Sequence, residues 1–250
     1  MRLKLIGTGN AAGIPIYGCE CLLCVKAKEN VGFRRGPASA LLEINEKKYL
    51  IDAGGMDIAD KFSDDKLDGI FLTHFHPDHV QGLFQLRWGK GESIPVYCPP
   101  DSLGCADLYK NSGILDFNSK KKFETFRIDY LQVTPLPLIH SKVTFGYFFE
   151  FENYRIAYLT DTKGLPPKTS IFLQDKMIDL LIIDTSHSPD VVDYNHNNLT
   201  ESLLIHDLLK PIRTVLTHIS HDFDIWLDEN KNNLPNNVVV AKDGIEVFPF

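Results

Sequence analysis

The most constraining feature of this sequence is the segment 74–79, His-Phe-His-Pro-Asp-His, which holds three imidazoles and one carboxylate within six residues. The apolar residues 69–72 before it are typical of a buried strand, and Val80 and Leu83 after it recur at helical spacing. The segment is therefore expected on a turn between a strand and a helix. Imidazole nitrogens and carboxylate oxygens are ligands for zinc, manganese, iron, cobalt and nickel, so the segment predicts a metal site.

The alternative is that these side chains only cap a helix or line a surface loop. Polar groups placed beside a buried strand would then lose their hydration without gaining a partner, which costs free energy. A bound metal ion removes that penalty, because it takes the nitrogen and oxygen lone pairs as ligands. The metal site is therefore favoured over the surface role.

A chain of 250 residues is longer than most single domains, but layered α/β folds reach this size as one unit, so we expect one domain over 1–250. No run of 18 apolar residues is present, and residues 1–5 read as the start of a strand rather than as a signal peptide. The sequence therefore predicts a cytoplasmic protein with no membrane partner.

The chain has a formal net charge of -7. A negative net charge disfavours electrostatic binding of a long phosphate backbone, so no extended nucleic acid is expected as a partner. A compact phosphate stays possible, because metal ions or a local basic patch can hold it. Arg34 and Arg35 form one basic pair, and it stays open whether they contact a phosphate or lie on solvated surface, as such pairs more often do.

Three of the five cysteines form the pattern C-x-C-x2-C over residues 19–24. An odd number of cysteines in a chain expected to be intracellular favours a metal-binding site, here called the cysteine clip, over disulfides. Zinc is the leading candidate for that clip. The remaining two, Cys98 and Cys105, are expected to be buried apolar residues.

The rest of the chain divides into two strand-rich halves with helices between the strands. Strands are expected at 3–6, 40–44, 48–51, 69–72, 94–98, 131–138, 144–151, 154–159, 179–184, 214–217, 237–241 and 245–248. A short helix is expected over 101–110 with Asp101 as its N-cap, and a longer one after Asn198, which forms a capping box with Glu201. This order predicts an α/β fold, an αββα sandwich with two facing sheets.

The pattern H-x-H-x-D-H resembles the signature of the metallo-β-lactamase superfamily, whose members hold one or two divalent ions between two packed β-sheets. Later strand ends supply a histidine, an aspartate and a histidine in the order that this superfamily calls for. The resemblance implies the metallo-β-lactamase fold and a dinuclear site with these ligands: His74, His76 and His140 for one metal, Asp78, His79 and His218 for the other, and Asp161 bridging both. It also implies that Asp52 supports the ligands by hydrogen bonds.

Segments outside this signature narrow the resemblance. Residues 17–21, 79–83, 86–89, 94–97, 133–138, 140–142 and 216–221 look like the PhnP family, phosphoribosyl 1,2-cyclic phosphate phosphodiesterases of the carbon-phosphorus lyase pathway. The likeness implies hydrolysis of a small phosphorylated sugar, 5-phosphoribosyl 1,2-cyclic phosphate, to ribose 1,5-bisphosphate in phosphonate catabolism. It further implies two catalytic divalent ions, manganese or zinc, and a homodimer.

The same resemblance implies roles for further residues. Members carry a separate structural zinc bound by three cysteines and a late histidine, and the matching positions are Cys19, Cys21, Cys24 and His221. His196 matches a histidine thought to act as general acid, so the catalytic set comprises His196 and Asp78. Lys142 is a candidate for stabilising the charge on phosphorus, and whether His187 lines the pocket stays open.

Two other members of the superfamily remain as alternatives. A tRNA 3′-processing endonuclease shares the metal motif but usually carries a protruding, basic, glycine-rich arm, and no segment of this chain looks like one. A PqqB-like cofactor-biosynthesis protein can have a comparable cysteine clip. Its relatives often depart from the complete metal set, whereas this chain retains every position.

Overall fold

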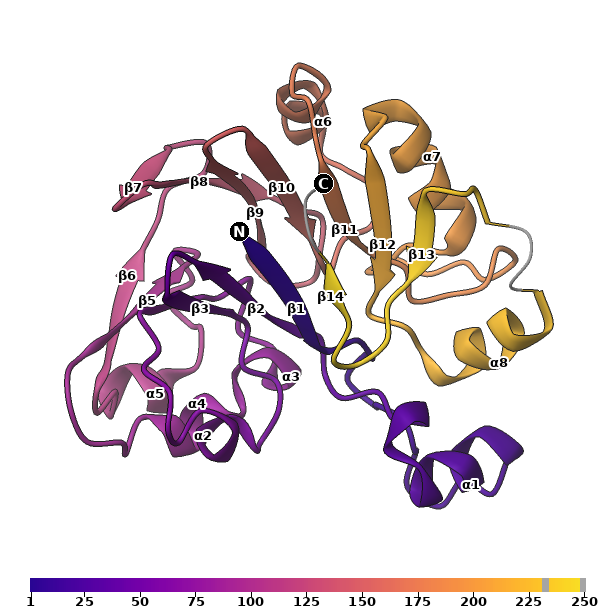
Figure 1. Cartoon of the computed structure of the whole chain (residues 1–250), viewed down its shortest axis with the longest axis horizontal. Helices are drawn as coiled ribbons and strands as arrows, with labels where there is room; N and C mark the ends of the chain where they lie inside the picture. The colour runs from indigo at the N-terminus through magenta and orange to yellow at the C-terminus, as the bar shows by residue number, and fades with distance from the viewer. Residues whose placement is uncertain (231–233, 248–250) are drawn as a thin grey trace.

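The structure, a computed structural model of the chain, describes residues 1–230 and 234–247. Two seven-stranded sheets face each other, and helices cover their outer sides (Figure 1). The αββα sandwich expected from the sequence is therefore confirmed. Within the described residues, no helix is long and apolar enough to cross a membrane.

The first sheet comes from the N-terminal half and one late strand, in the order β14-β1-β2-β3-β4-β5-β6. Its strands are β1 (Arg2–Gly7), β2 (Ser39–Ile44), β3 (Lys47–Ile51), β4 (Gly69–Phe71), β5 (Ile94–Cys98), β6 (Leu115–Ser119) and β14 (Glu246–Val247). Pairing is antiparallel from β14 to β3 and parallel from β3 to β6. The loops that follow β3 and β4 therefore leave the same edge of the sheet.

The second sheet has the order β13-β12-β11-β10-β9-β8-β7. Its strands are β7 (Phe126–Ile128), β8 (Leu131–Pro137), β9 (Phe145–Phe151), β10 (Tyr154–Leu159), β11 (Leu180–Asp184), β12 (Arg213–Thr217) and β13 (Val238–Val240). Strands β10 to β13 are parallel, and β7 to β10 are antiparallel. Side chains that follow β10, β11 and β12 consequently meet at one edge, where ligand sites of α/β sheets form.

Helices follow the strands and pack outside the sheets. They are α1 (Leu22–Glu29), the 3₁₀ helix η1 (Val31–Phe33), α2 (Ile58–Lys61), α3 (Pro77–Val80), α4 (Leu83–Leu86), α5 (Ala106–Lys110), α6 (Pro167–Gln174), α7 (Leu199–Leu209) and α8 (His221–Asn230). Figure 1 shows α2 to α5 beneath the first sheet and α6 to α8 beyond the second. Helix α1 stands apart from both sheets, below α8 in this view.

The apolar core forms three layers, as a four-layer sandwich requires. Between the sheets, the ring of Phe71 packs against Tyr147 and Phe149 with centroids 5.4 and 5.0 Å apart. One further cluster lies between each sheet and its helices. Strand β11 is buried on both faces, which explains why its sequence is continuously apolar up to Asp184.

Local signals set several boundaries. Asn45 and Glu46 both have positive φ, 46° and 68°, as the tight two-residue turn between β2 and β3 requires. The capping box of Asn198 and Glu201 at the start of α7 is present as predicted. The helix expected from Asp101 begins only at Ala106, because Oδ1 of Asp101 accepts the amides of residues 103 and 104 and forms a turn instead.

The C-terminal strands divide between the sheets. Residues 238–240 form β13 at the edge of the second sheet, whereas 246–247 form β14 at the edge of the first. The strand expected over 245–248 is thus shorter at its start, and its last residue lies outside the described residues. The last described strand, β14, therefore lies in the same sheet as β1.

Candidate metal centre

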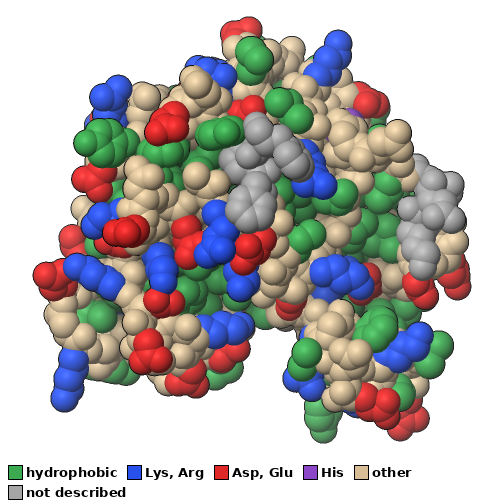
Figure 2. All heavy atoms as spheres, viewed as in Figure 1, with side chains coloured by type: hydrophobic (Ala, Val, Ile, Leu, Met, Phe, Trp, Pro, Cys, Tyr) green, Lys and Arg blue, Asp and Glu red, His purple; other side chains and the backbone are tan. Residues whose placement is uncertain are grey.

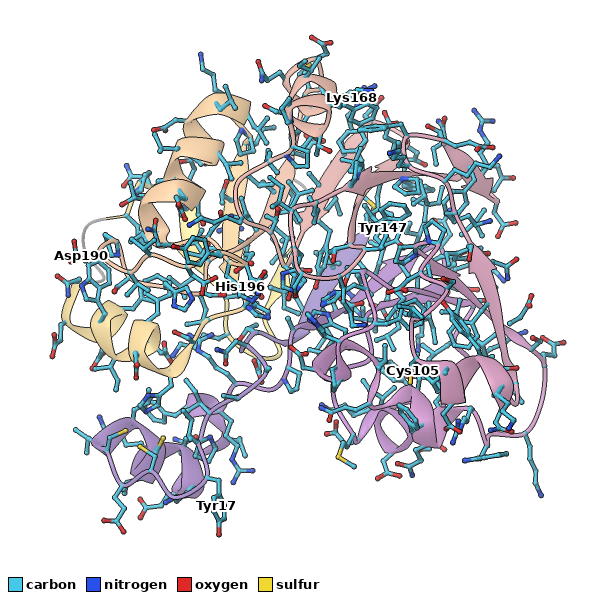
Figure 3. All side chains as sticks on the ribbon, turned by 180° about the vertical axis from the view of Figure 1, so that it is seen from behind. Tyr17, Cys105, Tyr147, Lys168, Asp190 and His196 are labelled. Carbon is cyan, nitrogen blue, oxygen red and sulfur yellow. The ribbon has the colours of Figure 1, made fainter. Side chains whose placement is uncertain are left out.

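The expected site residues come together at the edge where both sheets present the ends of parallel strands. Residues 74–79 follow β4, His140 follows β8, Asp161 follows β10 and His218 follows β12. Figure 3 shows His196 directed toward the middle of the molecule, where side chains from the two halves meet. Strands far apart in the sequence therefore supply one constellation.

One group within it contains three imidazoles and a carboxylate. Nδ1 of His76 lies 2.9 Å from Nε2 of His74 and 3.0 Å from Nε2 of His140. Oδ2 of Asp161 lies 3.8 Å from Nε2 of His74 and 3.6 Å from Nε2 of His140. The four ligand atoms lie within 4.8 Å of one another, so this group could hold a metal ion.

A second group lies on the other side of Asp161. Nε2 of His79 is 3.4 Å from Oδ2 of Asp78 and 3.4 Å from Oδ1 of Asp161. Nε2 of His218 is 3.9 Å from Oδ2 of Asp78 and 3.5 Å from Oδ2 of Asp161. Ligand atoms of Asp78, His79 and His218 also lie within 4.8 Å of one another. The carboxylate of Asp161 thus faces imidazoles of both groups.

Three polar atoms of this constellation are buried without a hydrogen-bond partner: Nε2 of His79, Nε2 of His218 and Oδ1 of Asp161. Buried polar atoms nearly always have a hydrogen-bond partner, because an unpaired one loses its hydration without gaining a hydrogen bond. A cation among these atoms would satisfy all three at once. The donor set therefore fits a divalent ion.

Surrounding side chains fix the ring orientations. Oδ2 of Asp52 lies 2.8 Å from Nδ1 of His79, and Oδ1 accepts the amide of Thr73 at 2.7 Å. Oγ of Ser186 lies 2.8 Å from Nδ1 of His218. With Nδ1 bound in this way, Nε2 of each ring is left to face the centre, which is how supporting groups orient metal-binding histidines. Asp52 is placed where its expected supporting role requires.

Three residues of the site have a left-handed backbone conformation. Asp52, Asp161 and His218 each follow the end of a strand, and their φ angles are 56°, 62° and 62°. Residues other than glycine seldom adopt this left-handed region, and such strain persists where the surrounding structure imposes it, often at functional sites. In each case the turn aims a polar side chain across the strand ends.

The charge states of the first group suit metal binding. Burial lowers the pKa of His74, His76 and His140, so these imidazoles are neutral near pH 7 and their lone pairs are free. Burial alone would raise the pKa of Asp161, but the imidazoles of His218 and His79 lower it well below the usual range. The group therefore combines neutral nitrogen ligands with a carboxylate anion.

His196 stands beside the second group on a buried carboxylate that sequence reasoning did not single out. Its Nδ1 lies 2.8 Å from Oδ2 of Asp184, and its ring stacks on that of His218 with centroids 4.7 Å apart. Burial lowers the pKa of His196, yet Asp184 outweighs it and raises that pKa to about 9. The contact with Asp184 therefore favours the protonated imidazole, and a ligand atom of His196 lies within 4.8 Å of ligand atoms of Asp161 and His218.

Asp184 also supports the rest of the second group. Its Oδ1 accepts a hydrogen bond from Ser186 at 2.8 Å, and its Oδ2 accepts the amide of Thr162 at 2.9 Å. Asp184 thus contacts neighbours of both His218 and Asp161 as well as His196. The sequence feature that could have identified Asp184 is its position at the end of the apolar strand β11, where a buried charged residue needs a polar partner.

The cysteine pattern forms a separate group at the projecting helix α1. Sγ of Cys21 lies 3.1 Å from Nε2 of His221, and Sγ of Cys19 lies 3.8 Å from it. Ligand atoms of Cys19, Cys21, Cys24 and His221 lie within 4.8 Å of one another. The amide of Cys24, and then His221, lowers the pKa of Cys21 to about 6, which favours the thiolate. Figure 2 shows the surface of this lobe standing apart from the main body.

Other candidates lie in different settings. His187 has its ring 6.5 Å from that of His196, close to the constellation. Lys142 is half-buried on the loop after His140. Of the pair Arg34 and Arg35, Arg34 is exposed, but solvated surface is wrong for Arg35, which is buried and forms an ion pair with Asp224 at 2.8 Å.

Comparison with known proteins gives relatives that match the whole chain. An octanoyltransferase from Porphyromonas gingivalis is 26% identical over 268 residues, which cover 99% of this chain and 51% of the relative. The chain thus spans about half the length of that curated relative. The match includes both halves of the sandwich.

Solved structures share the fold across their full length. A diphosphatase of the PhnP family is 27% identical, with a TM-score of 0.82 over 99% of this chain and 97% of that one. Zinc-bound PqqB from Methylobacterium extorquens is 19% identical, with a TM-score of 0.80 over 99% of this chain and 100% of that one. The second likeness shows the fold alone.

The family profile described as a beta-lactamase superfamily domain matches residues 48–219. This range holds β3, apart from its first residue, through β12 and every member of the constellation up to His218. The match covers more than half of the chain, and the sheet order described above agrees with it. The chain therefore belongs to the beta-lactamase superfamily and has the metallo-β-lactamase fold.

Proposed function

We propose that this chain is a metal-dependent phosphodiesterase that hydrolyses 5-phosphoribosyl 1,2-cyclic phosphate to ribose 1,5-bisphosphate. The observation that carries the proposal is the position of Asp161, whose carboxylate faces two groups of ligand atoms while its Oδ1 is buried and unpaired. Two groups that share one carboxylate suit two ions held close together. The 27% identity with a PhnP-family diphosphatase supports chemistry at phosphorus.

In this proposal each group holds one ion, manganese or zinc. The ligands are His74, His76 and His140 for one ion, Asp78, His79 and His218 for the other, and Asp161 for both. Two such ions supply a nucleophile near neutral pH and neutralise the oxygens of a phosphoryl group. The side chains of Asp52 and Ser186 keep the rings of His79 and His218 oriented while the substrate binds and leaves.

His196 is the proposed proton donor, and the ribose 2-oxygen is the leaving group. Asp184 binds Nδ1 of His196, so the proton on Nε2 is the one available to the site. An alkoxide leaves slowly unless it is protonated, so a positioned acid accelerates the step. His196 also lies within 4.8 Å of ligand atoms of Asp161 and His218, so a ligand role is the competing assignment. Metal content of a His196 variant separates the two.

The cysteine group is proposed to hold one structural zinc through Cys19, Cys21, Cys24 and His221. Three thiols and one imidazole are a usual tetrahedral donor set for zinc. The short distance from Cys21 to His221, together with the lowered pKa of Cys21, supports this assignment. The zinc would fasten the projecting α1 lobe to the start of α8.

A PqqB-like role is the second candidate, because zinc-bound PqqB superposes on the whole chain with a TM-score of 0.80. The two candidates differ in what they need from the constellation. Hydrolysis of the cyclic sugar phosphate uses both ligand groups and a proton donor, and the two groups that share Asp161, with His196 beside them, support that role. A binding or oxidative role would not require a proton donor such as the His196–Asp184 pair.

Product analysis tests the proposal. Purified protein is incubated with 5-phosphoribosyl 1,2-cyclic phosphate, a linear diester and a compound with a diphosphate linkage, and its metal content is measured on the same sample. The diphosphate compound is included because the relative at 27% identity is a diphosphatase. Ribose 1,5-bisphosphate as the main product supports the proposal, and turnover of the diphosphate alone contradicts it.

A further inference from the structure

The loop before His196 is held closed at its base and by its own side chains. His187 and Asn198 form a β-bridge, and the amide of Leu199 donates to the carbonyl of His187 at 2.9 Å. The side-chain amide of Asn198 donates to the carbonyls of Pro189 and Val191 at 3.2 and 2.9 Å. Residues 188–195 therefore form a closed loop, and His196 lies on its returning arm.

Asp193 fixes that returning arm. Its Oδ1 accepts the amide of Asn195 at 2.7 Å and the amide of His196 at 2.8 Å. Its Oδ2 lies 3.8 Å from Nε2 of His187, so the carboxylate also faces the first residue of the loop. One side chain thus joins both arms of the loop and binds the backbone of the proposed proton donor.

The peptide unit between Asn195 and His196 is held from both sides. Its N–H donates to Asp193, and its carbonyl oxygen, on Asn195, lies 3.3 Å from Nδ1 of His140. In a trans peptide the N–H and C=O groups point in opposite directions. The plane is therefore clamped between Asp193 and the ring of His140, and its orientation fixes where the side chain of His196 leaves the backbone.

We infer that Asp193 is a positioning residue for the reaction: it sets the place of the proton donor His196 through the clamped peptide. This inference rests on the proposed phosphodiesterase activity. Asp193 touches neither group of ligand atoms, so it acts through His196 and not on phosphorus. Loss of the clamp frees the peptide, and His196 then spends less time where its proton can reach the leaving oxygen.

The chain offers matched variants. Asp193→Ala removes both acceptors, whereas Asp193→Asn keeps an oxygen that can accept the same amides. Asp190→Ala changes an exposed carboxylate on the same loop and serves as the control. For the cyclic sugar phosphate, Asp193→Ala should lower kcat about 10- to 100-fold, as removal of groups that orient site residues typically does, with KM and metal content unchanged. Asp193→Asn and Asp190→Ala should stay near the wild-type rate.

Two readouts distinguish positioning from a general loss of structure. A diester with an aryloxide leaving group needs no proton, so Asp193→Ala should leave its turnover close to that of the wild type. In a His196→Ala background, the further change Asp193→Ala should have no additional effect on the cyclic substrate. An equal loss on both substrates, or a full additional loss in the double variant, overturns the inference.

A third readout needs no substrate. Hydrogen exchange of the Asn195 and His196 amides should be faster in Asp193→Ala and remain slow in Asp193→Asn. Unchanged exchange in Asp193→Ala overturns the clamp whether or not the protein hydrolyses a phosphodiester. If the wild type turns over none of the diesters, the proposed function fails, and the exchange measurement still decides the clamp.

Discussion

His218 directly follows β12 and His221, three residues later, is the first residue of α8, yet their side chains join two separate groups of potential metal ligands. Ile219, one of the two residues between them, is held in place, because its amide donates to the carbonyl of Thr8 at 2.8 Å and its carbonyl accepts the amide of Asn10 at 3.3 Å. One short segment therefore ties the α1 lobe, the N-terminal loop and the constellation around Asp161 together.

Cys21→Ser should lower the zinc content by about one ion per chain and lower the melting temperature, because structural zinc contributes folding free energy directly. Metal analysis and thermal unfolding check this. Cys105→Ser, which changes a cysteine outside the group, is the control and should keep its zinc. Zinc content and melting both unchanged in Cys21→Ser would reject the structural site.

Asp161→Ala should abolish hydrolysis and remove the ions of the shared site while the cysteine-bound zinc stays in place. The reason is that both ligand groups lose the carboxylate that faces them. His76→Ala should give the same loss of activity. Metal analysis of metal-replete protein should find about three divalent ions per wild-type chain, two of them at the shared site. A single ion in the wild type would contradict the dinuclear assignment.

His196→Ala should lower turnover of the cyclic sugar phosphate about 10²- to 10⁴-fold, the usual contribution of general acid catalysis, with metal content unchanged. The effect should shrink for bis(p-nitrophenyl) phosphate, because an aryloxide departs without a proton. Steady-state rates on both substrates check this. Loss of an ion in the variant would instead assign His196 as a ligand.

Arg35→Ala should destabilise the fold by about 3 to 5 kcal/mol, because it leaves Asp224 buried without its partner. The side chains of this pair are 1% and 10% exposed, and Arg35 also donates to Thr8 and to the carbonyl of Ala241. Denaturant unfolding measures the change. Lys121→Ala, which breaks an ion pair with both partners exposed, should leave the unfolding midpoint where it is. Equal effects of the two changes would contradict this account.

Much of the fold could be predicted because local signals agree with it. The apolar runs predicted the central strands, and the capping residues Asn198 and Glu201 predicted the start of α7. Strands β6 and β7 lie at sheet edges and were not predicted, because β6 is largely polar, Leu-Asp-Phe-Asn-Ser, and β7 has only three residues. Helices α1 and α8 were not predicted, because the cysteine and histidine residues at their N-termini were interpreted as metal ligands and not as helix starts.

For the site, the sequence predicted which residues would be gathered and that Asp52 would support them, but not the other side chains that hold them. The histidines and aspartates at strand ends stand out by type and position. The partners do not: Ser186 and Asp193 are ordinary loop residues, and only the folded loop brings Asp193 to the amides of 195 and 196. Arg35 was misplaced because nothing local shows that α8 returns Asp224 to it from 189 residues away.

The central claim is hydrolysis of a sugar cyclic phosphate by a dinuclear site, and one measurement addresses it most directly. Metal-replete protein is incubated with 5-phosphoribosyl 1,2-cyclic phosphate, the product is identified by phosphorus NMR, and metal is counted on the same sample. The account predicts ribose 1,5-bisphosphate, formed by the wild type and not by Asp161→Ala. A product with its phosphate on the 2-oxygen, or no turnover by protein that holds both ions, would contradict it.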